Sequence, residues 1–518
     1  MTNEYYTSPA RGRSLLRSAL LGMSMLASGA AVLPAHAGKA DDTLTVVFTK
    51  ELDTADVYFT SVREGNLLSF SGWDALLYRD VETGEYKGNL ATAWEWIDET
   101  TIEFTLREGV KFHNGEEFDA DDAVFTINTM ADPNSGIRNV NSVRWLKGAE
   151  KLDKYKIRVF LDKPFPAALE YFSVFIIMYP KDYYSAVGSA GMASAPIGTG
   201  PYRFESMQPG QGFTLVRNED YHDSPKGKPG IGKVVVRTIP DVNTQIAELM
   251  NGTVDFLWQV PQDQADRLAG RDNFQVLNAP TMRVGYLTMD AVSRTMDKSP
   301  MADVRVRRAI NHAIDRQGIL DALIPGNSEL VNSACAPSQF GCETDVPVYE
   351  YNPELAKSLL AEAGYPDGFT TDFYIYRDRP LAEAMVNMLA EVGIKTEMKT
   401  LQYAALVEQQ LQDKIPFSFQ TWGSGSVGDV SAITAALFDL SGRDDARDEE
   451  VTALLRQGNS SNDPETRKEH YSKALKLIAE RAYWVPLWLY STNYVTSTEV
   501  DFTPTADEYV RFYDLNWK

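Results

Sequence analysis

The stretch Arg107-Glu-Gly-Val-Lys-Phe-His-Asn-Gly-Glu-Glu-Phe-Asp-Ala-Asp-Asp-Ala-Val124 says most about the fold of this chain. It follows residues 101–106, whose β-branched and aromatic side chains are typical of a strand. Asn114-Gly115 is a strong signal for a tight turn, and Asp119 stands where a helix N-cap is expected. The stretch therefore predicts a strand end, a turn and a capped helix in direct succession.

Strand and helix patterns alternate along the rest of the chain, which predicts a mixed α/β protein. The expected strands are residues 44–48, 101–106, 156–161, 233–239 and 371–376. Helices are expected from Asp303 to Pro325-Gly326, from Asn352-Pro353 to Gly364, and from Asp463-Pro464 to about Arg481. Residues 278–286 are expected to link a strand-rich first half to a helix-rich second half, and residues 485–488 to lead into a short tail.

The chain has 518 residues, which is too long for one hydrophobic core and predicts two or three domains. Its formal net charge is −22. A surface this negative argues against nucleic acid or an anionic membrane as a partner.

The first 37 residues are expected to be a cleavable signal peptide. Arg11, Arg13 and Arg17 precede an apolar run, residues 19–33, and Ala35-His36-Ala37 fits a small-x-small cleavage site. The alternative, a membrane anchor, is disfavoured because the run is shorter than the roughly 20 residues that span a bilayer. The mature protein is therefore expected to begin at Gly38 and to be periplasmic, in a Gram-negative cell.

Two cysteines, Cys335 and Cys342, bracket the turn-rich sequence Ala-Pro-Ser-Gln-Phe-Gly. In an exported protein this arrangement favours a disulfide, which would stabilise the fold by roughly 2–3 kcal/mol. Reduced thiols are the alternative, and the spacing is too wide for a redox Cys-x-x-Cys site.

Residues 107–124 and several further blocks resemble the family-5 solute-binding proteins, the extracytoplasmic receptors that feed ABC importers with peptides, nickel or oligosaccharides. The further blocks are residues 73–78 with 88–91 and Trp94-Glu95, residues 196–202 with Arg217-Asn218 and Tyr221, residues 304–310 with 313–316, and residues 351–353 with 364–366. The resemblance covers nearly the whole chain after residue 37. It implies a two-lobed α/β periplasmic-binding-protein fold (type II, the large peptide-binding class), with an extra subdomain in lobe I and a hinged cleft.

The resemblance further implies lobe I at 38–281, with the extra subdomain at about 80–195, lobe II at 282–486, and a tail, 487–518, that returns to lobe I. Two crossings between lobes are what a hinge-closing receptor needs. Such a protein is not an enzyme and has no cofactor. It captures a small polar solute, such as a peptide, an opine or a sugar-phosphate conjugate, and as a monomer delivers it to an ABC permease in the inner membrane.

The segment Thr421-Trp-Gly-Ser-Gly-Ser-Val-Gly-Asp429 is rich in small residues, which let backbone N–H groups approach a ligand closely. A flexible surface loop is the alternative. The resemblance favours a ligand loop that includes Trp422, Gly423, Ser424, Gly425, Ser426 and Asp429. In peptide-binding members an Asp three residues after this Trp pairs with the α-amine of the peptide. Here that position is Gly425, and Asp429 is the candidate substitute.

Arg377 and Arg379 follow the expected strand 371–376, close to where peptide-binding members place an arginine that holds a carboxylate. A guanidinium binds a carboxylate or phosphate through two parallel hydrogen bonds. Surface positions are the alternative for both. Tyr58, after the first strand, and Arg283, at the expected crossing, complete the predicted ligand residues. An anion anchor without an amine anchor favours an acidic solute, such as an opine-like conjugate, a sugar phosphate or a modified peptide.

Other kinds of site find little support in the sequence. His113, His222, His312 and His470 lack the spacing of metal ligands, so no metal site is expected. Residues 227–234 nearly form a phosphate-binding loop but end in Val, where Ser or Thr is required. The alternative function is an exported hydrolase that uses paired carboxylates, although no spacing singles out a pair.

Overall fold

The computed structural model describes residues 38–60, 63–138, 143–208, 210–324 and 326–518. The predicted signal peptide and Pro325 lie outside these ranges. Residues 107–124 fold as predicted. β5 (Thr101–Leu106) precedes them, Gly115 turns the chain with a φ of 92°, and α2 (Ala120–Ala131) follows. The Asp119 carboxylate accepts from Asp121 N at 2.7 Å, and the Asp122 carboxylate accepts from Asp119 N at 3.0 Å, which completes a capping box.

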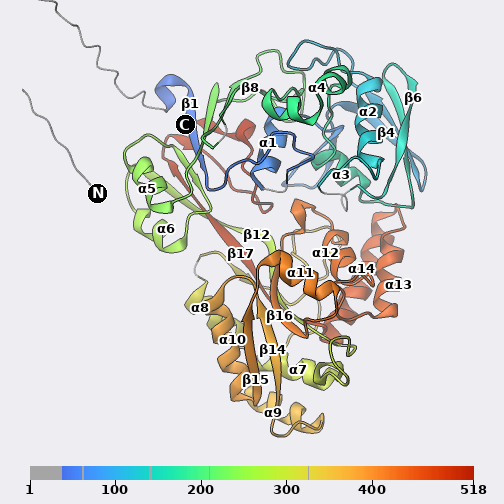
Figure 1. Ribbon diagram of the computed structural model, residues 1–518, viewed down its shortest axis with the longest axis vertical. Coiled ribbons are helices and arrows are strands. Elements are labelled where there is room, and N and C mark those ends of the chain that lie inside the picture. The colour runs from blue at the N-terminus through green and yellow to red at the C-terminus, as the bar shows by residue number, and fades with distance from the viewer. Residues whose placement is uncertain (1–37, 61–62, 139–142, 209, 325) are drawn as a thin grey trace, which may run out of the picture. The chain divides into compact units, whose positions relative to one another are not determined.

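Eleven strands of the described chain form one large sheet, and with the helices they make the mixed α/β fold that was predicted (Figure 1). The strand order is β15-β14-β16-β12-β17-β11-β1-β10-β9-β8, with β13 paired to β17. β1 runs parallel to β10 and β11, and β14 runs parallel to β15 and β16. The strands are β1 (Thr43–Phe48), β8 (Tyr202–Gln208), β9 (Gly212–Arg217), β10 (Lys233–Thr238), β11 (Phe256–Trp258), β12 (Phe274–Met289), β13 (Glu329–Leu330), β14 (Phe369–Ile375), β15 (Ile394–Thr400), β16 (Phe417–Trp422) and β17 (Trp484–Ser497).

β12 and β17 pair with each other along most of their length. Residues 274–280 of β12 pair with residues 491–497 of β17, and residues 284–288 pair with residues 484–489. The register shifts between Pro280 and Val284, where Thr281 Oγ1 donates to Tyr490 O at 2.7 Å. Residues 278–286, expected to link two halves of the chain, and residues 485–488, expected to lead into a tail, both belong to this strand pair. Both segments are strand, because each finds its partner far away in the sequence.

A separate four-stranded antiparallel sheet has the order β4-β5-β7-β6. α2 and α3 (Ala168–Val174) share its buried core, which includes Phe104, Phe118, Ile157 and Phe172. The additional strands are β4 (Ala91–Asp98), β6 (Leu146–Asp153) and β7 (Lys156–Leu161), and a hairpin is formed by β2 (Leu77–Arg79) and β3 (Tyr86–Gly88).

Another buried core gathers the helices that follow β12 with β14 and β16, around Phe373, Phe417 and Trp488. α9 (Pro353–Glu362) starts at the Asn352 cap, as predicted. The single helix expected from Asp303 is wrong, because the chain forms α7 (Val304–Ala313) and then α8 (Arg316–Leu323). The Asp315 carboxylate accepts from Gly318 N at 2.8 Å and so starts the second helix.

The remaining helices are α1 (Arg63–Gly72), α4 (Lys181–Ser194), α5 (Val242–Met250), α6 (Gln262–Leu268), α10 (Arg379–Glu391), α11 (Tyr403–Leu411), α12 (Ser431–Leu437), α13 (Glu449–Gly458) and α14 (Pro464–Glu480). α14 agrees with the helix predicted from Asp463-Pro464. Within the described ranges, no helix combines the length and the apolar character that crossing a bilayer requires.

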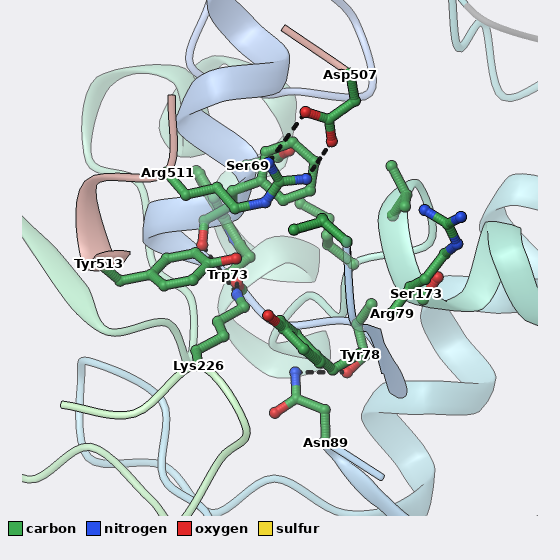
Figure 2. Close-up of a pocket in the computed structure, with 15 residues that line it drawn as sticks. Ser69, Trp73, Tyr78, Arg79, Asn89, Ser173, Lys226, Asp507, Arg511 and Tyr513 are labelled. Atoms are coloured by element: carbon green, nitrogen blue, oxygen red, sulfur yellow. Dashed lines mark hydrogen bonds and ion pairs between the residues drawn. The ribbon is translucent and has the colours of Figure 1, made fainter. Parts of the chain in front are cut away.

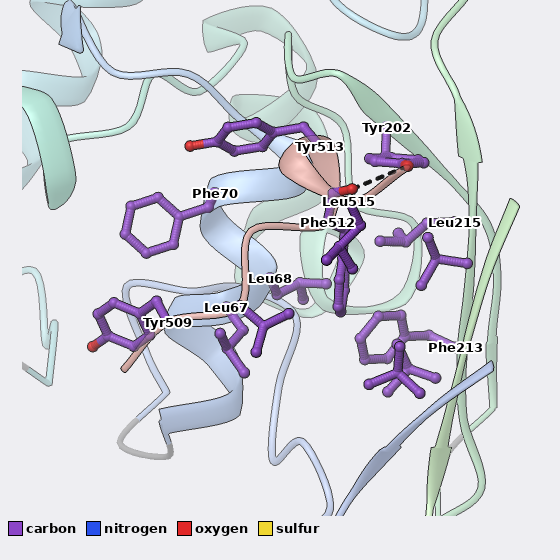
Figure 3. Packing of buried hydrophobic residues seen from close by; sticks show 14 of the residues in the cluster. Leu67, Leu68, Phe70, Tyr202, Phe213, Leu215, Tyr509, Phe512, Tyr513 and Leu515 are labelled. Carbon is purple, nitrogen blue, oxygen red and sulfur yellow. Dashed lines mark hydrogen bonds between the residues drawn. The ribbon is translucent and has the colours of Figure 1, made fainter. Parts of the chain in front are cut away.

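The C-terminal segment packs on α1. One buried cluster contains side chains from both, namely Leu67, Leu68 and Phe70 with Tyr509, Phe512, Tyr513 and Leu515 (Figure 3). Tyr202 Oη donates to Ile231 O at 2.8 Å and lies 3.4 Å from Phe512 O. The boundaries expected for lobe I, lobe II and the returning tail stay predictions.

The Asp74 carboxylate is fully buried and surrounded by five polar side chains. These are Asn89 Nδ2 at 3.2 Å, Thr199 Oγ1 at 3.1 Å, Tyr221 Oη at 3.0 Å, His222 Nε2 at 3.0 Å and Lys226 Nζ at 2.8 Å. Burial alone would raise the pKa of Asp74, but Lys226 and His222 hold it well below its usual range. This carboxylate thus joins sequence blocks that are far apart in the chain.

Replacing Asp74 by Asn should lower the free energy of unfolding by about 3–5 kcal/mol, because Lys226 would keep its buried charge without its partner. The double variant Asp74→Asn/Lys226→Met should recover part of this loss, since it removes the cation as well. Urea unfolding followed by circular dichroism measures both. A single variant as stable as the wild type would contradict this account of the network.

The lowered pKa of Asp74 also predicts how stability depends on pH. An unfolded Asp takes up its proton at about pH 3.9, whereas the folded state keeps Asp74 ionised to lower pH. The stabilisation is therefore complete above about pH 5 and is lost as the pH falls towards the folded pKa. Urea midpoints measured between pH 5 and pH 3 should fall more steeply for the wild type than for Asp74→Asn, and parallel curves would argue against the prediction.

Candidate ligand-binding site

The small-residue segment at 422–429 forms a compact turn at the end of β16 and is called the Gly/Ser loop below. Ser424 and Gly425 lie in a single turn of 3-10 helix, Ser424–Ser426, with φ angles of 55° and 59°. Ser424 is buried, whereas Gly425 is exposed. Only the backbone of Ser426 belongs to the described part of the chain. The loop therefore presents backbone rather than large side chains at its tip.

Glycines let two arginines approach the backbone of the Gly/Ser loop. A Cβ atom at Gly423 would lie 3.0 Å from Arg283 Nη2, and one at Gly428 would lie 2.3 Å from Arg79 Nη2. Arg283 belongs to β12 and Arg79 to β2. A larger residue at position 428 would displace a guanidinium, so this position is small because of what contacts it.

Glu170 of α3 also reaches the Gly/Ser loop. Its side chain is 1% exposed, and Oε1 accepts from Gly428 N at 2.8 Å. Oε2 accepts from Tyr86 Oη and pairs with Arg79 Nε, each at 3.0 Å. Burial raises the pKa of Glu170, and Arg79 and the Gly428 N–H oppose that rise. Residues 79, 86 and 170 thus form one polar cluster against the loop.

Three arginines gather near the end of β16 on the other side. Arg283 Nη1 lies 3.5 Å from Thr421 Oγ1, and its Nε lies 3.6 Å from Glu508 Oε1. The Arg443 guanidinium stands 5.2 Å from the centre of the Trp422 ring. Arg377 lies 5.2 Å from the centre of the Tyr490 ring and donates from Nε to Asp378 Oδ2 at 2.7 Å. Tyr376 connects this region to Thr421, with 2.8 Å between their hydroxyl oxygens.

Two of the predicted ligand residues lie in different surroundings. Arg379 opens α10, its side chain is 64% exposed, and it pairs with Glu383 one turn later. Among the described residues no hydrogen bond or ion pair joins Arg379 to the Gly/Ser loop. Asp429 is buried and engaged, because its Oδ2 lies 2.8 Å from Arg467 Nη2 and its Oδ1 accepts from Ser431 N at 2.9 Å. Pairing with a ligand amine would require Asp429 to give up Arg467.

Two adjoining cavities open beside the tail, since Ser69, Phe70 and Val174 line both. The first is polar and includes Arg79, Lys226, Asp507 and Arg511 in its wall (Figure 2). Arg511 is buried and paired with Asp507, and Lys226 is held by Asp74. Burial raises the pKa of Tyr78, in the same wall, to about 12.

The second cavity is apolar and is lined by Tyr58 with Val57, Met130, Ile137, Val143 and Phe175. Tyr58 Oη donates to Ile177 O, and burial raises the pKa of Tyr58 well above its ordinary value. Phe175 lies 3.6 Å from the place of a Cβ on Gly425. Arg79 and Phe175 therefore bring the two cavities up to the Gly/Ser loop.

Several residues at this site have no counterpart in the sequence predictions. Arg79, Glu170 and Arg443 belong to ordinary amphipathic segments, and nothing in their local sequence distinguishes them from surface charges. Gln339 also contacts the Gly/Ser loop, and it had one signal, its place between Cys335 and Cys342. The structure contains the disulfide between these two cysteines.

Comparison with known proteins gives consistent results. The model of the bacterial extracellular solute-binding proteins, family 5, matches residues 85–444. Heme-binding protein A of Haemophilus influenzae is 29% identical over 434 residues, which are 77% of this chain and 78% of that protein. The glutathione-binding protein GsiB of Escherichia coli is 26% identical over 498 residues, which are 92% of this chain and 93% of that protein.

Solved structures share the fold. HbpA2 from Haemophilus parasuis has a TM-score of 0.82 and 25% identity, covering 92% of this chain and 100% of that one. AgaA from A. tumefaciens R10, solved with agropinic acid, has a TM-score of 0.74 and 22% identity, covering 92% and 99%. These neighbours are two-lobed periplasmic binding proteins of the peptide-binding class, so the fold class predicted from the sequence is confirmed. The chain belongs to family 5 of the bacterial extracellular solute-binding proteins.

Proposed function

We propose that this chain is the periplasmic solute-binding component of an ABC importer and that its solute is a small, peptide-like molecule with at least two carboxylates. The solute lies between the Gly/Ser loop, with Arg283, Arg377 and Arg443, and the cavity that Tyr58 lines. The receptor acts as a monomer, leaves the solute chemically unchanged and delivers it to a permease in the inner membrane.

The charge around the Gly/Ser loop carries this proposal. Three guanidiniums stand near the end of β16, while the position of the amine-binding Asp of peptide-binding relatives is Gly425. Asp429 is already engaged by Arg467. A guanidinium offers five N–H donors, and the Arg377 contact with Asp378 uses Nε. Such a site favours carboxylates over a free ammonium group.

The ligands in the names of similar proteins have this chemistry in common. Glutathione, heme and agropinic acid, named for GsiB, heme-binding protein A and AgaA, all carry carboxylate groups. Glutathione is the first probe, because GsiB aligns with 92% of this chain. A plain dipeptide, with one carboxylate and an α-ammonium, is the matched contrast.

Capture requires that the groups on both sides of the solute close on it, and the register shift of β12 at 280–284 is where we place the hinge. Two paired strands cross there, and bending of such a crossing brings the Gly/Ser loop towards Glu170 and Tyr58. The solute stabilises the closed form because it contacts both sides, which shifts an existing equilibrium.

Isothermal titration calorimetry should show saturable binding of glutathione and much weaker binding of a plain dipeptide such as Ala-Ala. Arg377→Met should weaken the glutathione affinity by about tenfold, because it removes a charge-assisted hydrogen bond. Arg379→Met should change it by less than about twofold, since an exposed ion pair contributes little. Arg456→Met, which removes another exposed cation, is the control.

Tight binding of plain di- and tripeptides, together with no binding of glutathione or another polycarboxylate, would refute the proposed solute class. Native mass spectrometry of the protein purified from its own periplasm would then weigh the true solute directly. A solute recovered in altered form would refute the proposed receptor function itself.

Closure should depend on Glu170, because its carboxylate connects residues 79 and 86 to Gly428. Saturating glutathione should reduce the radius of gyration of the wild type in small-angle X-ray scattering. Glu170→Ala should lower the affinity about tenfold and shrink that change, whereas Glu117→Ala, at an exposed ion pair, should do neither. An unchanged radius of the wild type would count against closure, and full affinity in Glu170→Ala would exclude Glu170 from it.

A further inference from the structure

The ring closed by the Cys335–Cys342 disulfide lies directly against the Gly/Ser loop. Phe340 N donates to Gly428 O at 2.8 Å, and Val430 N donates to Phe340 O at 3.0 Å. These two bonds form a short parallel bridge between Phe340 and Asp429. The ring therefore touches the C-terminal half of the loop through backbone, independently of side-chain identity.

Gln339, inside the ring, makes the side-chain contacts. It is 3% exposed, and its Nε2 donates to Ser424 Oγ at 2.9 Å and to Val427 O at 3.1 Å, with Asp429 O at 3.4 Å. Its Oε1 accepts from Ala336 N at 3.1 Å. The amide thus has its acceptor in the ring and its donors on the loop, and spans the two segments.

The contact with Ser424 bears on the backbone geometry of the loop. Ser424 has a φ of 55°, a left-handed conformation that residues with a Cβ disfavour. Its buried hydroxyl is fixed by Gln339. Gly425, next in the chain, continues in the same region of conformational space and is exposed. Holding Ser424 in place therefore fixes the exposed tip of the loop.

The ring in turn fixes Gln339. Gln339 N donates to Ala336 O at 2.9 Å, and Cys342 N donates to Gln339 O at 3.1 Å, so both backbone polar groups of Gln339 are bonded within the ring. The disulfide restricts the conformations open to these few residues when the contacts break. Reformation of the loop is thereby favoured each time it opens.

We propose that Gln339 is the positioning residue of the Gly/Ser loop and that the Cys335–Cys342 ring is the frame that holds it. The role in solute binding rests on the proposed function of this loop. Gln339 does not touch the solute. It acts through Ser424, Val427 and Asp429, so its loss changes the loop before it changes the fold. Reduction of the disulfide weakens binding by the same route.

Hydrogen–deuterium exchange read by mass spectrometry tests the positioning role without any ligand. Gln339→Met keeps the side-chain length but removes the three donor contacts, and exchange at amides 423–430 should accelerate about tenfold while the rest of the chain is unchanged. Ser338→Ala, at an exposed residue of the same ring, is the matched control and should leave the loop as in the wild type. Cys335→Ser/Cys342→Ser should resemble Gln339→Met.

Unchanged exchange in the loop, or equal acceleration along the whole chain, would overturn the inference. Titration with glutathione then separates the two proposals. A wild type that binds no glutathione or other polycarboxylate, with the local exchange effect present, refutes the proposed solute and leaves the positioning role standing. A wild type that binds, with Gln339→Met binding equally well, refutes the role of Gln339 in solute binding.

Discussion

The buried carboxylate of Asp74 is the constraint on which the first half of the chain depends. A charge without solvent must be met by donors, and Asp74 receives them from four separate segments. Lys226, one of these donors, also bonds the carbonyl oxygens of Phe70 and Trp73 at the end of α1. Its ammonium lies 5.3 Å from the centre of the Tyr513 ring in the C-terminal segment. The polar wall of the first cavity is therefore assembled around one ionised oxygen pair.

The same network explains why part of the fold can be predicted from the sequence and part cannot. Local signals were reliable where a residue acts on its own neighbours, as Asp119 does at the start of α2 and Asn352 at the start of α9. The sequence blocks that carry the family resemblance include Asp74, Thr199 and Tyr221, which meet in space. Their convergence explains the spacing, but no local rule reveals it.

Predictions failed where the decisive partner is distant. Residues 278–286 are not among the strands expected from the sequence, yet β17 supplies the hydrogen bonds that keep them extended. Asp315 divides the expected long helix because its side chain caps a new one. At the site, the small residues of the Gly/Ser loop could be recognised. The charges that press on them, Arg79, Glu170 and Arg443, could not, because a charged residue in an amphipathic segment ordinarily faces water.

The paired crossing of β12 and β17 has a mechanical consequence. Two strands bonded edge to edge resist sliding past each other, because sliding would break every rung of the ladder. Twisting and bending leave most rungs intact, and the irregular step at 280–284 is the softest place for either. The crossing is thus a leaf spring with one easy direction, unlike a pair of loose tethers. Guests of different bulk would be met by different degrees of flexure about that direction, so the range of sizes accepted is set by the stiffness of a strip of sheet.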